Sequence, residues 1–364
     1  MTDNNFYENQ NLEESSAEIP AEQVPQKIIA EPKKEFKRFF PFGLTEKGYG
    51  EYKEIKRVSK ANGASFLFMN VLMIVVSFAL SFIFATLKIG NMSGTEFLDE
   101  PAIRQVQQIL FSMIYFLIPF LVCFKLAKFR ISDLVSFKKV EKKLILPLFL
   151  MGVSFCSFAN IAVSYAAAIF QSFGIDYNVD FGPNPTGFFG FCLTFISTVV
   201  TPALVEEFIC RGLILGSLRR FGDGFAIIVS AILFGLMHGN FQQIPFAFLV
   251  GLVLGFIVVK SGSLWVAVAV HAFNNFISVS FDYIFASFSD NAQNMIYTFI
   301  LAICLLTGII AVLLLKNADS DFYKIEKAQT ELTEKQKYKW FFKSPTIVIF
   351  IVFALIESVT FFFI

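Results

Sequence analysis

The chain has 364 residues, of which 55% are hydrophobic and 16% are charged, and its mean hydropathy is +0.64. This composition excludes an ordinary soluble globular protein. The formal net charge of +1 argues against a nucleic-acid partner, which would normally need a concentrated basic surface. The apolar content instead predicts an all-α, polytopic transmembrane helix bundle.

Residues 1–60 are expected to form a disordered and basic cytoplasmic N-terminal region. The first part, residues 1–32, is polar and acidic and has too little apolar content to fold. The second part, residues 33–60, is rich in Lys and Arg interleaved with Phe and Tyr. Such a segment is typical of the cytoplasmic side of a membrane protein, and its charges would also permit docking on anionic membrane lipids.

Apolar stretches of about 20 residues, the length that a helix needs to cross a bilayer, recur along the rest of the chain. They predict about eight or nine spans, at residues 64–87, 107–127, 144–170, 188–212, 225–240, 243–259, 264–286, 294–315 and 345–364. Alternate loops, such as residues 128–143 and 213–224, are rich in Lys and Arg, which predicts a cytoplasmic N-terminus. Residues 61–316 would then form the bundle, residues 317–343 a cytoplasmic linker and residues 344–364 a C-terminal span.

The two short stretches at residues 225–240 and 243–259 are expected to form a helical hairpin. Pro245 breaks helix geometry between them, and the turn would fall at residues 240–242. Within the second stretch, Gly251 and Gly255 form a small-xxx-small pair, which lets two helices approach closely.

Adjacent carboxylates, Glu206 and Glu207, lie late in the fourth span, with Arg211 one helical turn further on. Ionisable side chains are costly in hydrocarbon, so such a cluster indicates a functional site. Glu207 and Arg211 have the i,i+4 spacing that brings a carboxylate and a guanidinium together on one helix face. Glu206 projects about 100° around the helix and is left unpaired, as a general base requires. The alternative is that all three residues cap the cytoplasmic end of the helix.

The only two histidines, His238 and His271, both lie inside apolar stretches. A lone histidine such as His238 is also typical of a satisfied core residue. His271 and Asn275 have i,i+4 spacing, so their polar ends can converge inside the bundle or bond a neighbouring helix. Together with Glu206 at a compatible depth in a third helix, these residues predict a catalytic cluster within the membrane.

The order EExxxR, FxxxH and HxxxN on successive helices resembles the CPBP family of intramembrane endopeptidases. This family includes CAAX prenyl proteases and bacteriocin-processing enzymes and is also called Abi. The first motif falls on Glu206, Glu207 and Arg211, the second on Phe234 and His238, and the third on His271 and Asn275. The resemblance covers about residues 190–281.

The resemblance implies that a water molecule held in a membrane-embedded cavity hydrolyses a peptide bond. Glu206 would take the proton of the water and deliver it to the leaving amine, while His238 would orient the water. His271 and Asn275 would donate hydrogen bonds to the developing oxyanion. Glu207 and Arg211 would position Glu206. The substrate would be a peptide or a membrane protein, with or without a lipid group, and the protein would lie in a bacterial cytoplasmic membrane.

No cofactor is expected. Zinc held by Glu206, His238 and His271 is the alternative, because these three ligands would leave an open position as catalytic zinc sites do. The sequence has no HExxH signature. Two other functions are compatible with the same residues. A proton-coupled transporter would also use intramembrane carboxylates, although the chain shows no internal repeat. A non-catalytic bacteriocin-immunity or scaffold protein could share the fold.

Overall fold

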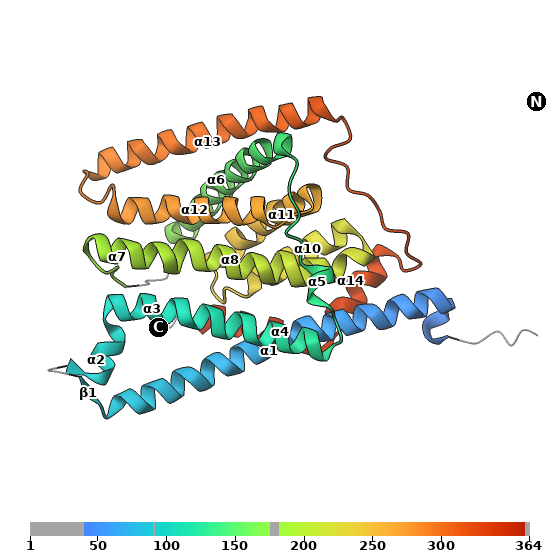
Figure 1. Ribbon diagram of the computed structural model, residues 1–364, viewed down its shortest axis with the longest axis horizontal. Coiled ribbons are helices and arrows are strands. Elements are labelled where there is room, and N and C mark those ends of the chain that lie inside the picture. Colours follow the sequence, from blue (N-terminus) through green and yellow to red (C-terminus); the bar gives the residue numbers. More distant parts are fainter. Residues whose placement is uncertain (1–39, 90–91, 175–181, 361–364) are drawn as a thin grey trace, which may run out of the picture. The chain divides into compact units, whose positions relative to one another are not determined.

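The computed structural model describes residues 40–89, 92–174 and 182–360, and Phe40–Ile364 form one unit. The predicted disordered tail at residues 1–32 lies outside the described residues. The described unit is helical apart from one short hairpin, which confirms the predicted all-α bundle (Figure 1). That hairpin pairs β1 (Lys88–Ile89) and β2 (Met92–Ser93) in antiparallel register.

Five helices are long and uninterrupted: α1 (Glu46–Ala85), α6 (Lys142–Ser172), α11 (Gln243–Ser261), α12 (Trp265–Tyr283) and α13 (Asp290–Ala318). One composite helix joins α3 (Pro101–Phe111), η2 (Ser112–Leu117) and α4 (Ile118–Leu126). A second joins α7 (Gly187–Thr194), η3 (Phe195–Val200), α8 (Thr201–Glu207), η4 (Phe208–Ile214), α9 (Leu215–Leu218) and η5 (Arg219–Phe221). The shorter helices are η1 (Pro41–Gly43), α2 (Gly94–Asp99), α5 (Ile131–Leu134), α10 (Asp223–Leu236), α14 (Glu334–Phe342) and α15 (Pro345–Thr360).

Among the described residues, 6 helices are long and apolar enough to cross a membrane. The number rises to 7 if α14 and α15, which meet at a bend of 71°, count as one span. This number is smaller than the eight or nine apolar stretches expected from the sequence. Every predicted stretch does contain a helix, but α10 has only 14 residues and α12 carries polar side chains through its middle. These two helices lie inside the bundle, where α12 packs on α6, α8, α11 and η3.

Helices extend into both the predicted N-terminal region and the predicted linker. Helix α1 begins at Glu46, after Thr45 accepts a hydrogen bond from the backbone N–H of Gly48 at 3.0 Å, so residues 46–60 are helical. The predicted linker contains α14, whose capping box is formed by Thr333 and Gln336. Helix α14 packs against α1 and is part of the folded unit.

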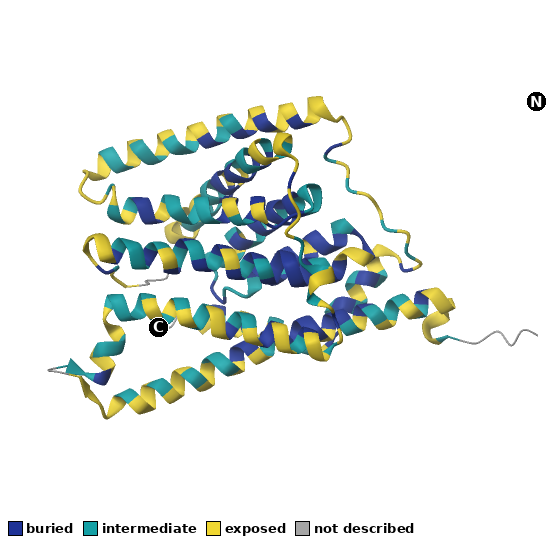
Figure 2. Ribbon diagram, viewed as in Figure 1, coloured by how far each residue is buried: buried dark blue, intermediate teal, exposed yellow. Residues whose placement is uncertain are grey.

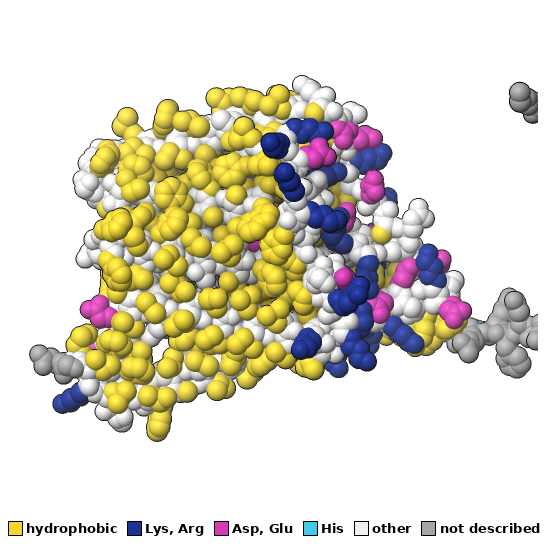
Figure 3. All heavy atoms as spheres, in the orientation of Figure 1, with side chains coloured by type: hydrophobic (Ala, Val, Ile, Leu, Met, Phe, Trp, Pro, Cys, Tyr) yellow, Lys and Arg dark blue, Asp and Glu magenta, His cyan; other side chains and the backbone are white. Residues whose placement is uncertain are grey.

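Burial follows the position of each helix in the bundle. The residues around α8, α10 and the first half of α1 are buried, whereas α13 and the second half of α1 are largely exposed (Figure 2). The exposed side chains of these two helices are large and apolar, for example Phe78, Phe82 and Leu306. Lys and Arg side chains gather at one end of the helices, and hydrophobic side chains cover the surface beside them (Figure 3). This distribution is that of an integral membrane protein.

Helices α10 and α11 form the predicted hairpin, with the turn at residues 237–242. Their backbones approach closely at Gly251, where an added Cβ atom would lie 2.9 Å from Cα of Ala231. At Gly255 the neighbours are side chains at 3.3 Å or more, which leaves more room. The hairpin ends at Gly262, whose φ of 67° gives the left-handed conformation that commonly terminates a helix.

Candidate active site

Helix α8 carries Glu206 and Glu207 between two π-helical stretches, η3 and η4. A π-helical turn changes the backbone hydrogen-bond register and is frequent at functional sites. In η3, the backbone carbonyl of Thr198 accepts a hydrogen bond from Nδ2 of Asn275 at 2.9 Å. The π-helical segment therefore joins the carboxylate helix to α12, which carries the third sequence motif.

Glu207 is the centre of a buried polar network. Its Oε1 accepts hydrogen bonds from Nη1 of Arg211 at 2.9 Å and from Nδ1 of His271 at 2.9 Å. The side chains of Glu207 and Arg211 are both fully buried. The i,i+4 ion pair expected from the spacing is thus present, and His271 from α12 joins it. Removing charges from water is expensive, so each charge in this network depends on its partner.

The ring of Phe234 lies among the other members of the cluster. Cζ of Arg211 lies 4.1 Å from the centroid of this ring, a distance typical of a cation–π contact. The Phe234 ring also makes edge-to-face contacts with both imidazoles. Its centroid lies 5.1 Å from the ring centroid of His238 and 6.2 Å from that of His271. Phe234 therefore connects the three motifs, and it is the contact through which His238 joins the group.

The hydrogen bonds of the two histidines assign their tautomers. An ionised carboxylate only accepts hydrogen bonds, so Nδ1 of His271 carries the proton that faces Glu207. Nδ1 of His238 lies 2.8 Å from the carbonyl oxygen of Phe234, which also only accepts. In the neutral form, both imidazoles therefore present an unprotonated Nε2. This arrangement does not match the expected role of His271 as an oxyanion donor in the resting state.

Glu206 differs from its neighbour in exposure and in contacts. Its side chain is 16% exposed, against 0% for Glu207. Its Oε2 lies 4.0 Å from Nε2 of His271. The structure thus brings Glu206, Glu207, Arg211 and His271 together, whereas Asn275 bonds the backbone of η3 one turn away from His271.

The turn that carries His238 depends on residues that the sequence analysis did not single out. Nδ2 of Asn240 donates to the carbonyl oxygen of His238 at 2.8 Å and to Oε1 of Gln243 at 2.9 Å. Gly239 has a φ of 62°, and an added Cβ atom would lie 2.6 Å from the carboxyl carbon of Glu357 on α15. The positive φ could not be predicted because an isolated glycine carries no unique conformational signal. Glu357 could not be placed because no sequence pattern relates it to this turn.

A metal site requires several ligands around one point. Among the described residues, no group of three or more His, Cys, Asp or Glu side chains is arranged to hold a metal ion. The Nε2 atoms of His238 and His271 have the chemistry of zinc ligands, because their Nδ1 atoms are fixed by a carbonyl and a carboxylate.

Residues 188–277 match a family model described as type II CAAX prenyl endopeptidase Rce1-like. The matched segment runs from the start of α7 into α12 and contains all three motifs. This segment, about a quarter of the chain, is similar to intramembrane endopeptidases of the CPBP family. No curated protein and no solved structure matches the chain.

The family assignment decides between the functions left open by the sequence. It favours the endopeptidase over the transporter and over the non-catalytic immunity or scaffold protein. The family acts on membrane-associated peptide or protein substrates. Helices α1 to α6 and α13 to α15 lie outside the matched segment, so the match carries no information about their role in this endopeptidase.

Proposed function

We propose that the endopeptidase hydrolyses a peptide bond with a water molecule that Glu206 activates in a membrane-embedded site. The observation that carries this proposal is the 4.0 Å separation between Oε2 of Glu206 and Nε2 of His271. This separation is too long for a direct hydrogen bond, but one water molecule could lie about 2.8 Å from both atoms. Because both atoms are acceptors, they would hold the water by its hydrogens and leave its lone pairs facing the substrate carbonyl.

In the proposed reaction, Glu206 takes a proton as the water oxygen attacks the carbonyl carbon. The C–N bond then breaks, and Glu206 delivers the same proton to the leaving amine. Glu207 would fix the orientation of His271 through the hydrogen bond to Nδ1. Asn275 retains a second N–H on Nδ2, which is the proposed donor to the oxyanion.

His238 is proposed to orient the water or the substrate through its Nε2 atom. The bond from Nδ1 to the carbonyl of Phe234 and the contact with the Phe234 ring would hold the imidazole in one rotamer. The fixed tautomer supports a role as an acceptor rather than as a second general acid in the resting enzyme. Arg211 is proposed to stabilise ionised Glu207 and to act only through it.

The proposed substrate is a peptide or a membrane protein, and the proposed location is a bacterial cytoplasmic membrane. A metal-free reaction is proposed because Glu206 can serve as the base without one. Activity that survives exhaustive chelation would support this proposal. Loss of activity on chelation, followed by recovery on addition of zinc, would overturn it and favour the zinc alternative.

The experiment that tests the function is a cleavage assay with the detergent-purified full chain and a quenched fluorescent peptide library. Glu206→Gln keeps the size of the side chain but removes the base, so kcat should fall by about 10²–10⁴-fold. His238→Ala should also lower kcat. The matched control is Glu326→Gln, an exposed acid in the segment between α13 and α14, which should leave kcat unchanged. Parental activity in Glu206→Gln would refute the proposed role.

A further inference from the structure

An apolar groove of about 650 Å³ lies between the beginnings of α6 and α12 and the segment that precedes α6. Its volume falls within the range of about 300–1,000 Å³ that is typical of ligand sites. Two lysines, Lys139 and Lys142, are part of its lining. The rest of the lining is hydrocarbon or aromatic and includes Phe137, Val140, Ile145, Leu146, Trp265 and Ala269. The groove therefore combines an apolar wall with two positive charges.

The segment before α6 is fixed against the turn between α11 and α12. Oγ of Ser136 donates to the carbonyl oxygen of Gly262 at 2.6 Å. The backbone N–H of Leu264 donates to the carbonyl oxygen of Ser136 at 3.0 Å. The rings of Phe137 and Trp265 lie next to each other, with their centroids 5.4 Å apart. These contacts hold the walls in place, so the groove is preformed.

The residues of the groove change from polar to apolar along α6. Lys142 is the first residue of this helix, and the exposed side chains of Ile145 and Leu146 follow about 5 Å further along it. Trp265, at the start of α12, is also exposed, and tryptophan is enriched where lipid headgroups meet the acyl chains. This order matches a membrane interface, with the ammonium groups on the headgroup side and the apolar wall on the hydrocarbon side.

The positive charge of the groove is not balanced by acids of the chain. Residues 138–143 hold four lysines and one glutamate. The glutamate, Glu141, forms an ion pair with Lys143, in which Oε2 and Nζ are 3.0 Å apart. Within the part of the chain that the structure describes, neither Lys139 nor Lys142 forms an ion pair. An anionic group at this position would supply the counter-charge.

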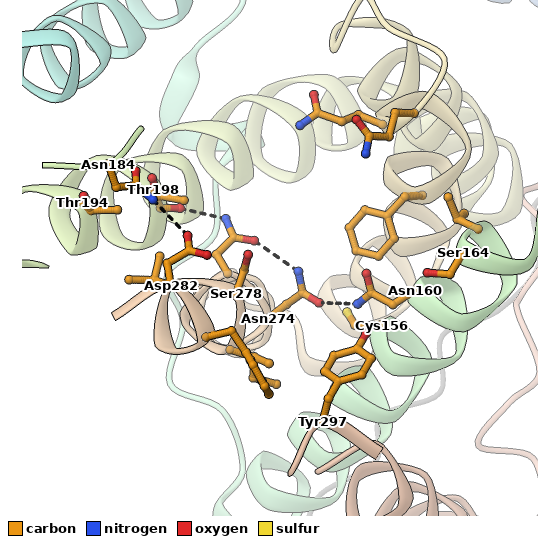
Figure 4. Close-up of a pocket in the computed structure, with 18 of the residues that line it drawn as sticks. Cys156, Asn160, Ser164, Asn184, Thr194, Thr198, Asn274, Ser278, Asp282 and Tyr297 are labelled. Carbon is orange, nitrogen blue, oxygen red and sulfur yellow. Dashed lines mark hydrogen bonds between the residues drawn. The ribbon is translucent and has the colours of Figure 1, made fainter. Parts of the chain in front are cut away.

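The groove is separate from a larger polar cavity of about 1020 Å³ (Figure 4). That cavity lies further along the same two helices, where Nδ2 of Asn160 on α6 donates to Oδ1 of Asn274 on α12 at 3.2 Å. The two described linings have no residue in common. Amides and hydroxyls line much of the cavity, whereas the groove offers few partners for hydrogen bonds, so the two spaces suit different ligands.

The groove also lies apart from the proposed catalytic cluster. Ala269 lines the groove, and His271 follows two residues later on α12. Two residues correspond to a rotation of about 200° around a helix, so the two side chains face nearly opposite directions. Substitutions in the groove can therefore be made without touching the reacting groups.

We propose that this groove binds an anionic phospholipid of the surrounding bilayer. The lipid phosphate lies beside Lys139 and Lys142, and an acyl chain covers the apolar wall. A peptide fits less well, because the wall would leave its backbone groups without partners. If the basic end is cytoplasmic, as the distribution of Lys and Arg predicts, the anionic lipids of that leaflet are the source. This proposal goes beyond the proposed hydrolysis and does not depend on it.

The chain has only two tryptophans, Trp265 and Trp340, which allows a local test. In the Trp340→Phe variant of the full chain, Trp265 reports on the groove alone. The variant is reconstituted in phosphatidylcholine vesicles that contain increasing shares of brominated phosphatidylglycerol or brominated phosphatidylcholine, since bromine on an acyl chain quenches a tryptophan that it contacts. Two lysines near the surface should give phosphatidylglycerol a relative affinity about 5–30-fold higher.

The lysines are tested in the same background. Lys139→Gln/Lys142→Gln should lower the preference for phosphatidylglycerol by about fivefold or more. The matched control is Lys125→Gln/Lys128→Gln, which removes two exposed lysines at the end of α4, outside the groove, and should leave the preference within about twofold of the parent. Added salt should weaken the preference, because the lysines of the groove are exposed.

The apolar wall is tested by Ala269→Phe, which fills the groove but keeps both lysines. The quenching by brominated phosphatidylglycerol, measured against the same vesicles without bromine, should decrease. The control Ala302→Phe, on an exposed residue of α13, should not change it. A second measurement needs no change of tryptophan. In detergent, phosphatidylglycerol should raise the Tm of the parental chain more than phosphatidylcholine does, and this difference should disappear in Lys139→Gln/Lys142→Gln.

Several results would overturn the proposal. Equal quenching by both brominated lipids would make the groove an ordinary lipid-facing surface. No quenching by either lipid would show that protein covers Trp265, such as a second copy of the chain. Relief of the quenching by soluble glycerophosphate would indicate a phosphate site that does not need the acyl chain. A full preference retained in Lys139→Gln/Lys142→Gln or in Ala269→Phe would show that the groove does not select the lipid.

Discussion

Glu206 and Glu207 are neighbours in the chain but have opposite surroundings. Glu207 is fully buried and bound by Arg211 and His271, whereas Glu206 is partly exposed and lies 4.0 Å from His271. A carboxylate held by two donors is a stable structural charge, and an unpaired one beside an imidazole can exchange a proton. The difference in surroundings therefore supports separate roles for two chemically identical side chains.

Removal of the Arg211 guanidinium should destabilise the protein, because the buried charge of Glu207 loses one of its partners. Arg211→Met keeps much of the side-chain volume but leaves Glu207 with one partner, so the free energy of unfolding should fall by about 3–5 kcal/mol. Thermal unfolding in detergent measures this loss. The double variant Glu207→Gln/Arg211→Met removes both charges and should regain part of the stability. If the two substitutions were simply additive, the pair would not be coupled as the contact distance indicates.

Gly239 should be intolerant of a side chain for two separate reasons. Its φ of 62° disfavours any other residue, and an added Cβ atom would meet the carboxyl group of Glu357. Gly262→Ala is a matched control, since Gly262 has a φ of 67° but has open space around it. Both variants should lose about 1–2 kcal/mol of stability from the backbone, with Gly239→Ala losing more. Only Gly239→Ala should lower kcat, because it displaces the turn beside His238.

A second substitution separates the two causes at Gly239. Adding Glu357→Ala removes the carboxyl group and should restore part of the stability and of the activity. No recovery in the double variant would show that the contact with α15 is unimportant.

The sequence predicts the Glu207–Arg211 pair, because i,i+4 spacing is local. It does not predict the contacts of His271 with Glu207 or of Glu357 with Gly239, because these depend on how distant helices pack.

At the scale of the elements, the helices were predictable and their role as spans was not. The apolar stretches mark all the long helices, and Pro245 with residues 240–242 marks the α10–α11 hairpin. The sequence predicts α10 and α12 as spans, but α10 is shorter and α12 more polar than the helices that meet the length and hydropathy expected of a span. The π-helical stretches η3 and η4 were also unpredictable, because they have no distinctive composition.

The close approach of α10 and α11 gives a prediction for the hairpin. Gly251→Ala places a methyl group 2.9 Å from a backbone atom of Ala231, so the helices must separate, at a cost of about 1–3 kcal/mol. Gly255→Ala meets only side chains at 3.3 Å or more and should cost less. Thermal unfolding of the two variants gives the comparison. Equal losses would mean that the hairpin is not tightest at Gly251.

At the scale of the whole described unit, α14 is attached to the composite helix that carries Glu206, although α14 lies outside the family match. Buried Lys337 donates from Nζ to the carbonyl of Phe221 at 2.7 Å and to Oε1 of Glu334 at 2.6 Å. Phe221 is the last residue of the composite helix that carries Glu206. The sequence suggested only a linker here, since a buried lysine cannot be recognised from composition.

Loss of this attachment should destabilise the protein without touching the reacting groups. Lys337→Met keeps the aliphatic chain but removes the charged donor, so the free energy of unfolding should fall by about 1.5–3 kcal/mol. The control Lys335→Met, on an exposed residue of the same helix, should have little effect. A Lys337→Met variant as stable as the parent would show that α14 is held by apolar packing alone.

The central claim is that Glu206 and His271 share one water molecule inside the membrane. An experimental structure of the endopeptidase, at a resolution that shows ordered water, tests this claim directly. The account predicts a single solvent peak about 2.8 Å from both Oε2 of Glu206 and Nε2 of His271. A direct hydrogen bond between the two side chains, side chains turned to different faces, or a metal ion bound by both would contradict it.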